Sequence, residues 1–432
     1  MRAPPLPPYA QAATGAWSAA ILQFLTSVIV VRSLAPREVG TFVFGSSIAI
    51  FVFGILDLRV EEGLTQFLIR ERKVRREART ASALRFAVAL DVVSGAVILG
   101  VAVGAVTLGA LHLDSETRGV TAIALLTGFI GVTDGSFGAI LYAHQAFGWL
   151  SAYQIVANGS RCIALLALPI GSAIDAAWAG ALAQAGTTAF VIIVVVWRFL
   201  PRHAPSESLP TAERRWLVRF SIHIGLASAV ATVRATAIPL VLGAIGTKSE
   251  VARARVAESP TKLLGTVVAP LRTVLFPQLS AAWARRDRTE ARRLIGRYLA
   301  TTTLLAGVLG GAMAFGINFI LTRIYGAAYD DLARVGQFFV LAALLDALAG
   351  WQKVAPAALD RPWLRTVILL GESTVLVAGL VILVPPYGPL GAAISSALAA
   401  AASIVMGAYW LRPAFAEESW VELPLDGSRQ QA

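Results

Sequence analysis

The chain has 432 residues, of which 56% are hydrophobic and 15% charged, and its mean hydropathy is +0.69. Its apolar runs repeatedly reach the roughly 20 residues that a helix needs to cross a bilayer. A net charge of +11 would suggest nucleic-acid binding in a soluble protein, but here the positive residues lie between the apolar runs, which excludes that class. The single cysteine, Cys162, excludes a disulfide framework and a cysteine-based metal site.

The apolar runs predict an all-α, polytopic membrane protein with about twelve transmembrane helices. In chain order, the expected spans are Ala12–Val31, Thr41–Leu58, Leu84–Leu108, Gly119–Tyr142, Ser151–Gly171, Ala177–Val196, Leu217–Ala244, Glu258–Phe276, Tyr298–Leu321, Gly336–Ala357, Trp363–Val384 and Leu390–Trp410.

The segment Arg59–Arg79, after the second span, is the longest strongly charged run of the sequence. Most lysines and arginines outside the spans lie on the same side as this segment. Because positive residues concentrate in cytoplasmic loops, we expect Arg59–Arg79 and both termini in the cytoplasm.

The chain also shows an internal repeat. A second basic segment, Ser280–Arg297, follows the eighth span as Arg59–Arg79 follows the second, and a proline-rich stretch separates six spans from six. The predicted parts are a bundle at residues 1–198, a cytoplasmic linker at 199–216, a bundle at 217–412 and a cytoplasmic tail at 413–432. Two bundles of equal orientation are typical of transporters built from parallel repeats.

Both basic segments carry apolar residues at helical spacing, for example Leu64, Phe67 and Leu68. Such segments can lie along the inner leaflet, with the arginines toward anionic lipid. The alternative is that they act only as anchors that fix the topology.

Ionisable residues within a span are expensive and therefore mark candidate functional positions. In the eighth span, Glu258, Lys262 and Arg272 share one predicted helix face with small residues, and Pro260 and Pro270 interrupt the helix. One interpretation is a face that lines a water-filled cavity. In the other, Glu258 and Lys262 lie at the outer interface and Arg272 reaches the inner one.

Two more arginines lie inside predicted spans, Arg161 in the fifth and Arg234 in the seventh. A ring of Arg161, Arg234, Lys262 and Arg272 from both halves would attract a diphosphate, because guanidinium forks suit phosphate oxygens. Each of these cations could instead pair with a buried acid such as Asp91 or Asp134.

Five acids complete the candidate set: Asp91, Asp134, Glu258, Asp346 and Glu372. They could bind a coupling proton or sodium ion, or pair with the cations. No Walker A motif and no metal-ligand pattern is visible in the sequence, so we expect no catalytic residue, no cofactor and no bound metal.

The segment Leu22–Phe51 closely resembles the start of the polysaccharide biosynthesis or O-antigen flippase family of the multidrug/oligosaccharidyl-lipid/polysaccharide exporter superfamily. The likeness rests on Arg32, Leu34, Pro36, Glu38, Gly40 and Phe42 between the first two spans, on Phe276–Leu279, and on Tyr387–Ala392 before the last span. Where members often carry an aspartate just after an arginine in the seventh helix, this chain has Ala235, Thr236 and Ala237 after Arg234.

The resemblance implies a MATE-like fold and a non-enzymatic flippase of the cytoplasmic membrane that translocates a polyprenyl-diphosphate-linked oligosaccharide by alternating access. Its partners would be that substrate, membrane lipids, and a polysaccharide polymerase and glycosyltransferases. The alternatives are an ion-coupled multidrug exporter of the same superfamily and a non-transporting scaffold for polysaccharide assembly.

Overall fold

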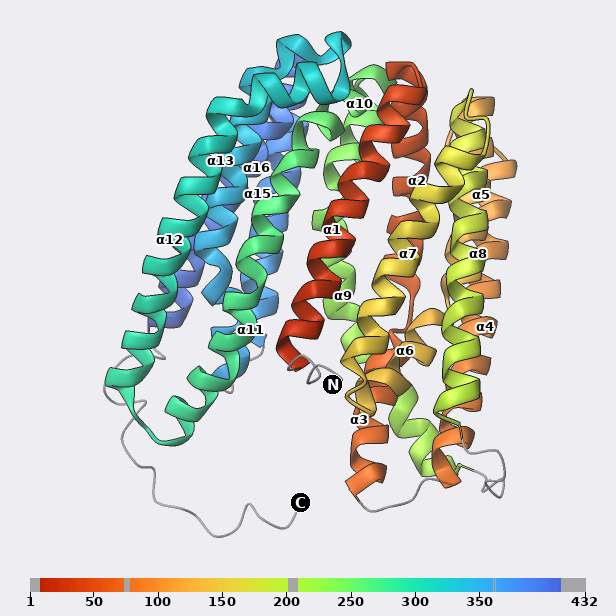
Figure 1. The fold of residues 1–432 in the computed structure, drawn as a ribbon, viewed down its shortest axis with the longest axis vertical. Helices are drawn as coiled ribbons and strands as arrows, with labels where there is room; N and C mark the ends of the chain where they lie inside the picture. Colours follow the sequence, from red (N-terminus) through yellow and green to blue (C-terminus); the bar gives the residue numbers. More distant parts are fainter. Residues whose placement is uncertain (1–7, 74–77, 201–208, 360, 362, 413–432) are drawn as a thin grey trace, which may run out of the picture.

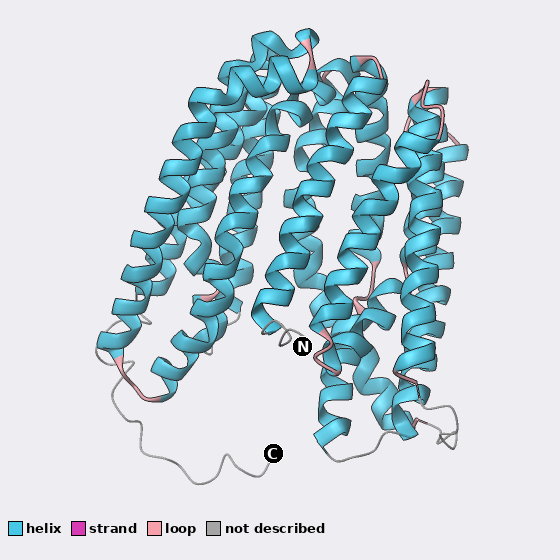
Figure 2. Ribbon diagram, viewed as in Figure 1, coloured by secondary structure: helices cyan, strands magenta, loops and turns pink. Residues whose placement is uncertain are grey.

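The computed structural model describes residues 8–73, 78–200, 209–359, 361 and 363–412, and all regular structure within them is helical (Figures 1 and 2). The α-helices are α1 (Pro8–Ser33), α2 (Pro36–Leu56), α3 (Val60–Lys73), α4 (Ala78–Thr107), α5 (Ser115–Gly131), α6 (Asp134–Ala143), α7 (Phe147–Ala167), α8 (Ala173–Arg198), α9 (Thr211–Ile245), α10 (Lys248–Glu258), α11 (Lys262–Ala284), α12 (Arg288–Phe319), α13 (Ala333–Leu348), α14 (Ala355–Ala358), α15 (Trp363–Tyr387) and α16 (Pro389–Leu411). Short 3-10 or π turns continue several of them, at Ser259–Thr261, Ile320–Tyr325, Ala327–Leu332 and Ala349–Lys353.

Within the described residues, 11 helical stretches are long and apolar enough to cross a membrane. They coincide with the predicted spans except for the fifth, where α7 is a continuous helix that is not among the 11. Each of the twelve predicted runs is thus helical, which confirms the all-α, polytopic prediction.

The largest errors in the predicted helix starts are at the eighth and ninth spans, and the ninth begins at Arg288 rather than at Tyr298. The eighth span begins at Lys248 rather than at Glu258, because Thr247 and Glu250 form a capping box that starts α10. The charged residues of α10 lower its hydropathy, so the apolar pattern of the sequence did not reveal this helix. The helix that contains the seventh span, α9, begins at Thr211, within the predicted linker.

The helices form two groups that converge at the upper end in Figure 1 and spread apart at the lower end. Helices α2 and α4–α8 lie on the right and α11–α16 on the left, with α1, α9 and α10 between them. The helix α3 and the turn between α11 and α12, which carry the basic segments, both lie at the lower end, so this is the predicted cytoplasmic end.

At the upper end one hydrophobic core joins the two halves. It packs Val30, Val39 and Ala179 of the first half against Val256 and Tyr329 of the second. The backbones of α2 and α10 touch there, since a Cβ added to Gly40 would lie only 1.6 Å from the carbonyl oxygen of Lys248.

At the lower end each group has a core of its own. The right-hand core runs from Val60 of α3 to Val195 of α8 and takes from later in the chain only Leu209 and Leu217, whereas the left-hand core contains only residues between Leu275 and Leu411. In the described part of the chain, no core cluster joins the two groups at this end. We call the upper end, where one core joins the two halves, the closed end, and the lower end, where the two groups have separate cores and spread apart in Figure 1, the open end.

The two basic segments differ in structure. Leu64, Phe67 and Leu68 of α3 are buried at 0%, 4% and 3% exposure against α4 and α6, which argues against the alternative that they lie along the leaflet and leaves the anchor. A helical pattern alone does not distinguish a lipid-facing side from a protein-facing one. The segment Ser280–Arg297 is the end of α11, a turn and the start of α12, not a separate helix like α3.

Candidate functional site

The second half contains a cluster of paired charges, which we call the second-half cluster: Arg234 of α9, Asp346 of α13, Lys353 of the turn Ala349–Lys353, and Glu372 of α15. Arg234 lies 2.6 Å from Asp346 through Nη2 and 2.6 Å from Glu372 through Nε. Lys353 lies 2.5 Å from the same Asp346 oxygen. The alternative that cations pair with buried acids is thus correct for Arg234, although its acids are Asp346 and Glu372 rather than Asp91 or Asp134.

Glu372 is the most deeply buried member, at 1% exposure. Neither of its carboxylate oxygens has a hydrogen-bond partner, so the close contact with Arg234 is an ion pair without hydrogen-bond geometry. A buried carboxylate with a single ionic partner depends strongly on that partner.

A second group of charges lies at the break between α10 and α11, and we call it the hinge triad: Arg255, Glu258 and Lys262. Glu258 lies 3.0 Å from Arg255 and 4.0 Å from Lys262. The helix breaks because Pro260 lacks the N–H of a regular turn, and Ser259–Thr261 becomes a 3-10 turn. Ten residues of α10 precede Glu258, so Glu258 does not lie at the start of this stretch, where the sequence placed it.

The side chain of Lys262 is 46% exposed although it follows this mid-span break. The turn beside it faces α1, since the hydroxyls of Ser259 and Ser27 lie 3.2 Å apart. Glu258 is within electrostatic range of Arg234 as well as of Lys262, and Asp346 is within range of Arg272. The three predicted cations of the second half, Arg234, Lys262 and Arg272, are thus all within electrostatic range of Glu258 or Asp346.

Arg272 lies deeper along α11, where α11 meets the turn at Ala349–Lys353. A Cβ added to Gly350 would lie 3.0 Å from its Cδ and 2.2 Å from the hydroxyl of Tyr298. Arg272 therefore packs within the second half, and the alternative that it reaches the inner interface is not needed to explain its position.

The first half has a different polar arrangement, which we call the first-half cluster and which centres on Asp134 at the start of α6. Its carboxylate accepts hydrogen bonds from Thr188 at 2.6 Å, Gln184 at 2.8 Å and Tyr153 at 3.1 Å. The amide oxygen of Gln184 accepts a 3.4 Å bond from Arg161. Arg161 is exposed, and within the described residues no acid pairs with it directly.

Asp91 of α4 is 3% exposed and accepts a 2.5 Å hydrogen bond from Ser136 of α6. This bond joins two helices of the first half. Like Asp134, Asp91 is held by uncharged donors and not by an arginine.

A pocket of about 460 Å³ lies between α3, α6 and α7. Its acidic lining residues are Glu61, Glu62 and Asp134, and Tyr142 and Tyr153 supply aromatic walls. Burial and the neighbouring carboxylate of Glu61 raise the pKa of Asp57, which lies in the turn just before α3, and the pKa of Glu62 rises for the same two reasons.

Arg59 contacts both a residue that lines this pocket and a residue of α9. Its Nη1 lies 3.0 Å from Glu61, and its Nε donates a 2.8 Å hydrogen bond to Ser228. Neither Glu61 nor Tyr153 was among the candidate site residues predicted from the sequence, although an acidic pair directly after a span is a visible signal.

The structure does not join the four predicted cations into one ring through direct contacts. Arg234, Lys262 and Arg272 share the second-half acids, while Arg161 belongs to the first-half cluster. Within the described residues, no group of three or more His, Cys, Asp or Glu side chains could hold a metal ion. Cys162 is buried between α7 and α1, 3.0 Å from the Thr26 hydroxyl and 3.2 Å from the Leu22 carbonyl.

A family model described as polysaccharide biosynthesis protein matches residues 12–283. The chain belongs to this family. No curated protein sequence matches it significantly.

Several transporters of known structure have the same fold. An inward-facing multidrug resistance MATE transporter of the MOP superfamily superposes with a TM-score of 0.69 at 15% identity, covering 97% of this chain and 96% of that one. An outward-facing form gives 0.67 at 14% identity and 96% of each chain. A MOP superfamily transporter from Pyrococcus furiosus, described as having a binding pocket of reversed polarity, gives 0.65 at 15% identity, covering 94% and 96%. The polysaccharide biosynthesis protein described here thus has the MATE fold and is a multi-pass membrane protein.

Proposed function

We propose that this protein is a flippase that moves a polyprenyl-diphosphate-linked oligosaccharide across the cytoplasmic membrane. Membership of the polysaccharide biosynthesis family supports the substrate class, and the MATE fold supports transport. The observation that carries the proposal is a set of cations at mid-span, of which Lys262 and Arg161 are exposed. Exposed cations within spans offer a polar path for an anionic head group.

The chemistry of the substrate explains why such a path is needed. A diphosphate and its sugars would face a prohibitive desolvation cost in hydrocarbon. Lys262 and Arg161 would hold the diphosphate while the polyprenyl chain stays in the bilayer. This reaction forms and breaks no covalent bond, so no catalytic residue and no cofactor are required.

The arrangement of the cores supports alternating access as the mechanism. The described conformation is closed by a shared core at the upper end and has separate cores at the lower end. With both termini in the cytoplasm, as the positive-inside rule predicts, this conformation would receive the substrate from the cytoplasmic side. Opening of the upper core would then release the head group outside.

The test is to replace Lys262 and Arg161 singly with Gln and to measure surface polysaccharide at equal protein level in the membrane. We expect a large loss of polymer in both variants. Arg118→Gln is the control, because Arg118 lies at the upper end of α5 and donates to the Leu113 carbonyl. Normal polymer in both K262Q and R161Q would contradict the proposal. Arg234 is less suitable for this test, because its removal also leaves the buried carboxylate of Glu372 without its ionic partner.

A second candidate function, ion-coupled export of organic cations, is favoured by one observation. The pocket lined by Glu61, Glu62 and Asp134 has acidic and aromatic walls, which suit a lipophilic cation. This candidate predicts that Glu61→Gln with Glu62→Gln abolishes efflux of a fluorescent lipophilic cation and leaves surface polysaccharide unchanged. This candidate would be excluded if the parent chain shows no efflux of the cation and the double variant loses surface polysaccharide.

A further inference from the structure

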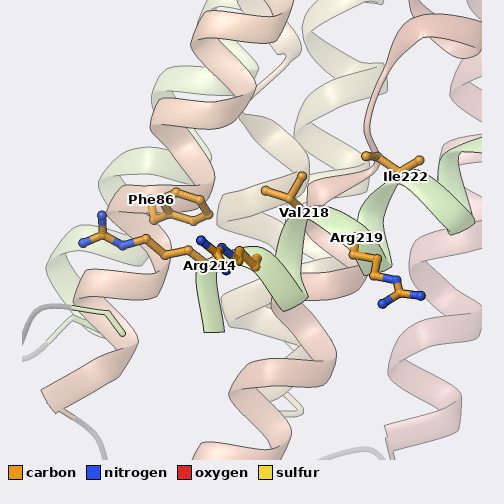
Figure 3. Close-up of a pocket in the computed structure, with 6 residues that line it drawn as sticks. Phe86, Arg214, Val218, Arg219 and Ile222 are labelled. Carbon is orange, nitrogen blue, oxygen red and sulfur yellow. The ribbon is translucent and has the colours of Figure 1, made fainter. Parts of the chain in front are cut away.

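A shallow groove of about 370 Å³ lies between α4 and α9, away from the charged clusters described above. Phe86 of α4 forms one wall, and Val218 and Ile222 of α9 supply apolar surface (Figure 3). Arginines 214, 215 and 219 of α9 line the same groove. The groove therefore has an apolar floor and a positively charged border.

The arginines of the groove are exposed, and the nearby acid is already engaged. Glu213 pairs with Arg79 at 3.0 Å. The guanidinium of Arg214 lies 5.7 Å from the ring centroid of Phe86, so it is held over the apolar wall. Within the described residues no acid pairs with Arg214 or Arg215, and the groove carries an excess of positive charge.

The length of α9 gives the depth of the groove in the membrane. The helix has 35 residues, and the three arginines of the groove all lie within its first nine. At 1.5 Å per residue it is about 52 Å long, well beyond a hydrocarbon core of about 30 Å. Its first turns therefore lie at the lower membrane surface.

Aromatic side chains on the same turns agree with this depth. Trp216 stacks on Phe220 with 5.0 Å between ring centroids and is 39% exposed, and Ile222 is 45% exposed. Tryptophans concentrate at the boundary between hydrocarbon and head groups. The arginines thus lie at head-group level, and the apolar surface of Ile222 lies toward the hydrocarbon.

We propose that this groove binds an anionic phospholipid of the inner leaflet. The lipid phosphate lies between Arg214 and Arg215, and the upper part of an acyl chain packs on Phe86, Val218 and Ile222. The charge favours an anionic over a zwitterionic head group, because each arginine near the surface adds attraction for negative lipid. The apolar floor requires a lipid and not a free phosphate ion.

Such a lipid would stabilise the packing of the start of α9 against the first half. Leu217, one residue before Val218, is fully buried in the core that contains α3 and α4. Helix α9 belongs to the second half by sequence and yet packs on the first half here. A lipid that bridges α4 and α9 therefore stabilises the arrangement in which the lower end is open, whatever substrate the protein carries.

The experiment uses the full chain in detergent, supplied with an equal mixture of phosphatidylglycerol and phosphatidylcholine, and native mass spectrometry to count bound lipids. We expect phosphatidylglycerol to be retained preferentially. Arg214→Gln with Arg215→Gln should lower its ratio to phosphatidylcholine by about thirty-fold, from two arginines near the surface. The control is Arg285→Gln with Arg297→Gln, which removes the same charge from the α11–α12 region.

A second variant separates the groove from general surface charge. Val218→Trp keeps all the arginines but fills the apolar floor, and it should also abolish the preference. An equal loss of preference in the R285Q/R297Q control, or an unchanged preference in both R214Q/R215Q and V218W, would overturn the proposal. A rise in melting temperature with inorganic phosphate equal to that with phosphatidylglycerol would likewise overturn it, because the site would then bind only the anion.

Discussion

The Nε atom of Arg234 lies 2.6 Å from the carboxylate of Glu372, which is 1% exposed, so one ion pair joins α9 to α15 inside the second half. Asp346 keeps Lys353 when Arg234 is removed, but Glu372 keeps no other partner among the described residues. Arg234→Ala should therefore lower stability by about 3 to 5 kcal/mol, because it leaves a buried charge uncompensated.

The double variant Arg234→Met with Glu372→Met should recover most of that loss, since it removes both charges. The melting temperature in detergent checks this order. The control is Arg253→Ala, whose partner Asp331 is 60% exposed, and it should change stability by about 1 kcal/mol or less. A single R234A variant as stable as the parent chain would contradict a stabilising role of this ion pair.

Gly40 makes the close approach of α2 and α10 possible at the closed end. Gly40→Ala places a methyl group 1.6 Å from the Lys248 carbonyl oxygen, so the backbones must separate. We expect a loss of about 1 to 3 kcal/mol, measured as a lower melting temperature. Gly100→Ala in α4 meets no atom within 4 Å and should be neutral or slightly stabilising. Equal melting temperatures for the two variants would contradict the close contact.

The three donors to Asp134 are not equivalent. Thr188→Val removes the 2.6 Å hydrogen bond and keeps the side-chain volume, whereas Tyr153→Phe removes the 3.1 Å bond. We expect about 1 to 2 kcal/mol of destabilisation from T188V and less from Y153F. Thr374→Val is the control, because the exposed Thr374 hydroxyl bonds only a carbonyl of its own helix. Greater destabilisation by Y153F would reverse the ranking.

Asp57 should make stability depend on pH. Burial and the neighbouring Glu61 raise its pKa in the folded protein above the ordinary value of 3.8. Between these two values the folded state holds more protons than the unfolded state, so stability increases as the pH falls through the raised pKa. Asp57→Asn should remove this part of the pH dependence of the melting temperature, while Asp330→Asn at the upper end should keep it. A steeper dependence in D57N would mean that the sign is wrong.

Much of the helical framework could be predicted from the sequence, because apolar runs of sufficient length have few alternatives in a membrane. The start of α10 was missed for the converse reason, since Lys248, Arg253 and Arg255 make it polar although it continues a span. For α3 the sequence left two alternatives, a helix along the lipid and a topological anchor, because periodicity shows an apolar face but not what it packs against. Leu64 shows that this neighbour is protein.

The candidate residues were predictable as a set but not as pairs. Buried charge identified Arg234, Asp346 and Glu372 individually. Arg234 and Asp346 are separated by 112 positions, and only packing of α9 against the later helices brings them together. Pairing changes what each charge can do, since an arginine neutralised by two acids is less available to an anion than Lys262 or Arg161.

The single cysteine gives a practical route to watching the lower end move. The Sγ atom of Cys162 lies 3.0 Å from the Thr26 hydroxyl and 3.2 Å from the Leu22 carbonyl oxygen, and a serine hydroxyl could form both hydrogen bonds instead. Cys162→Ser would thus yield a chain without thiols. One cysteine could then be introduced on α3 and one on the turn between α11 and α12, and each could carry a spin label. The distance between the two labels in a lipid bilayer would report how far apart the two groups of helices lie at the lower end.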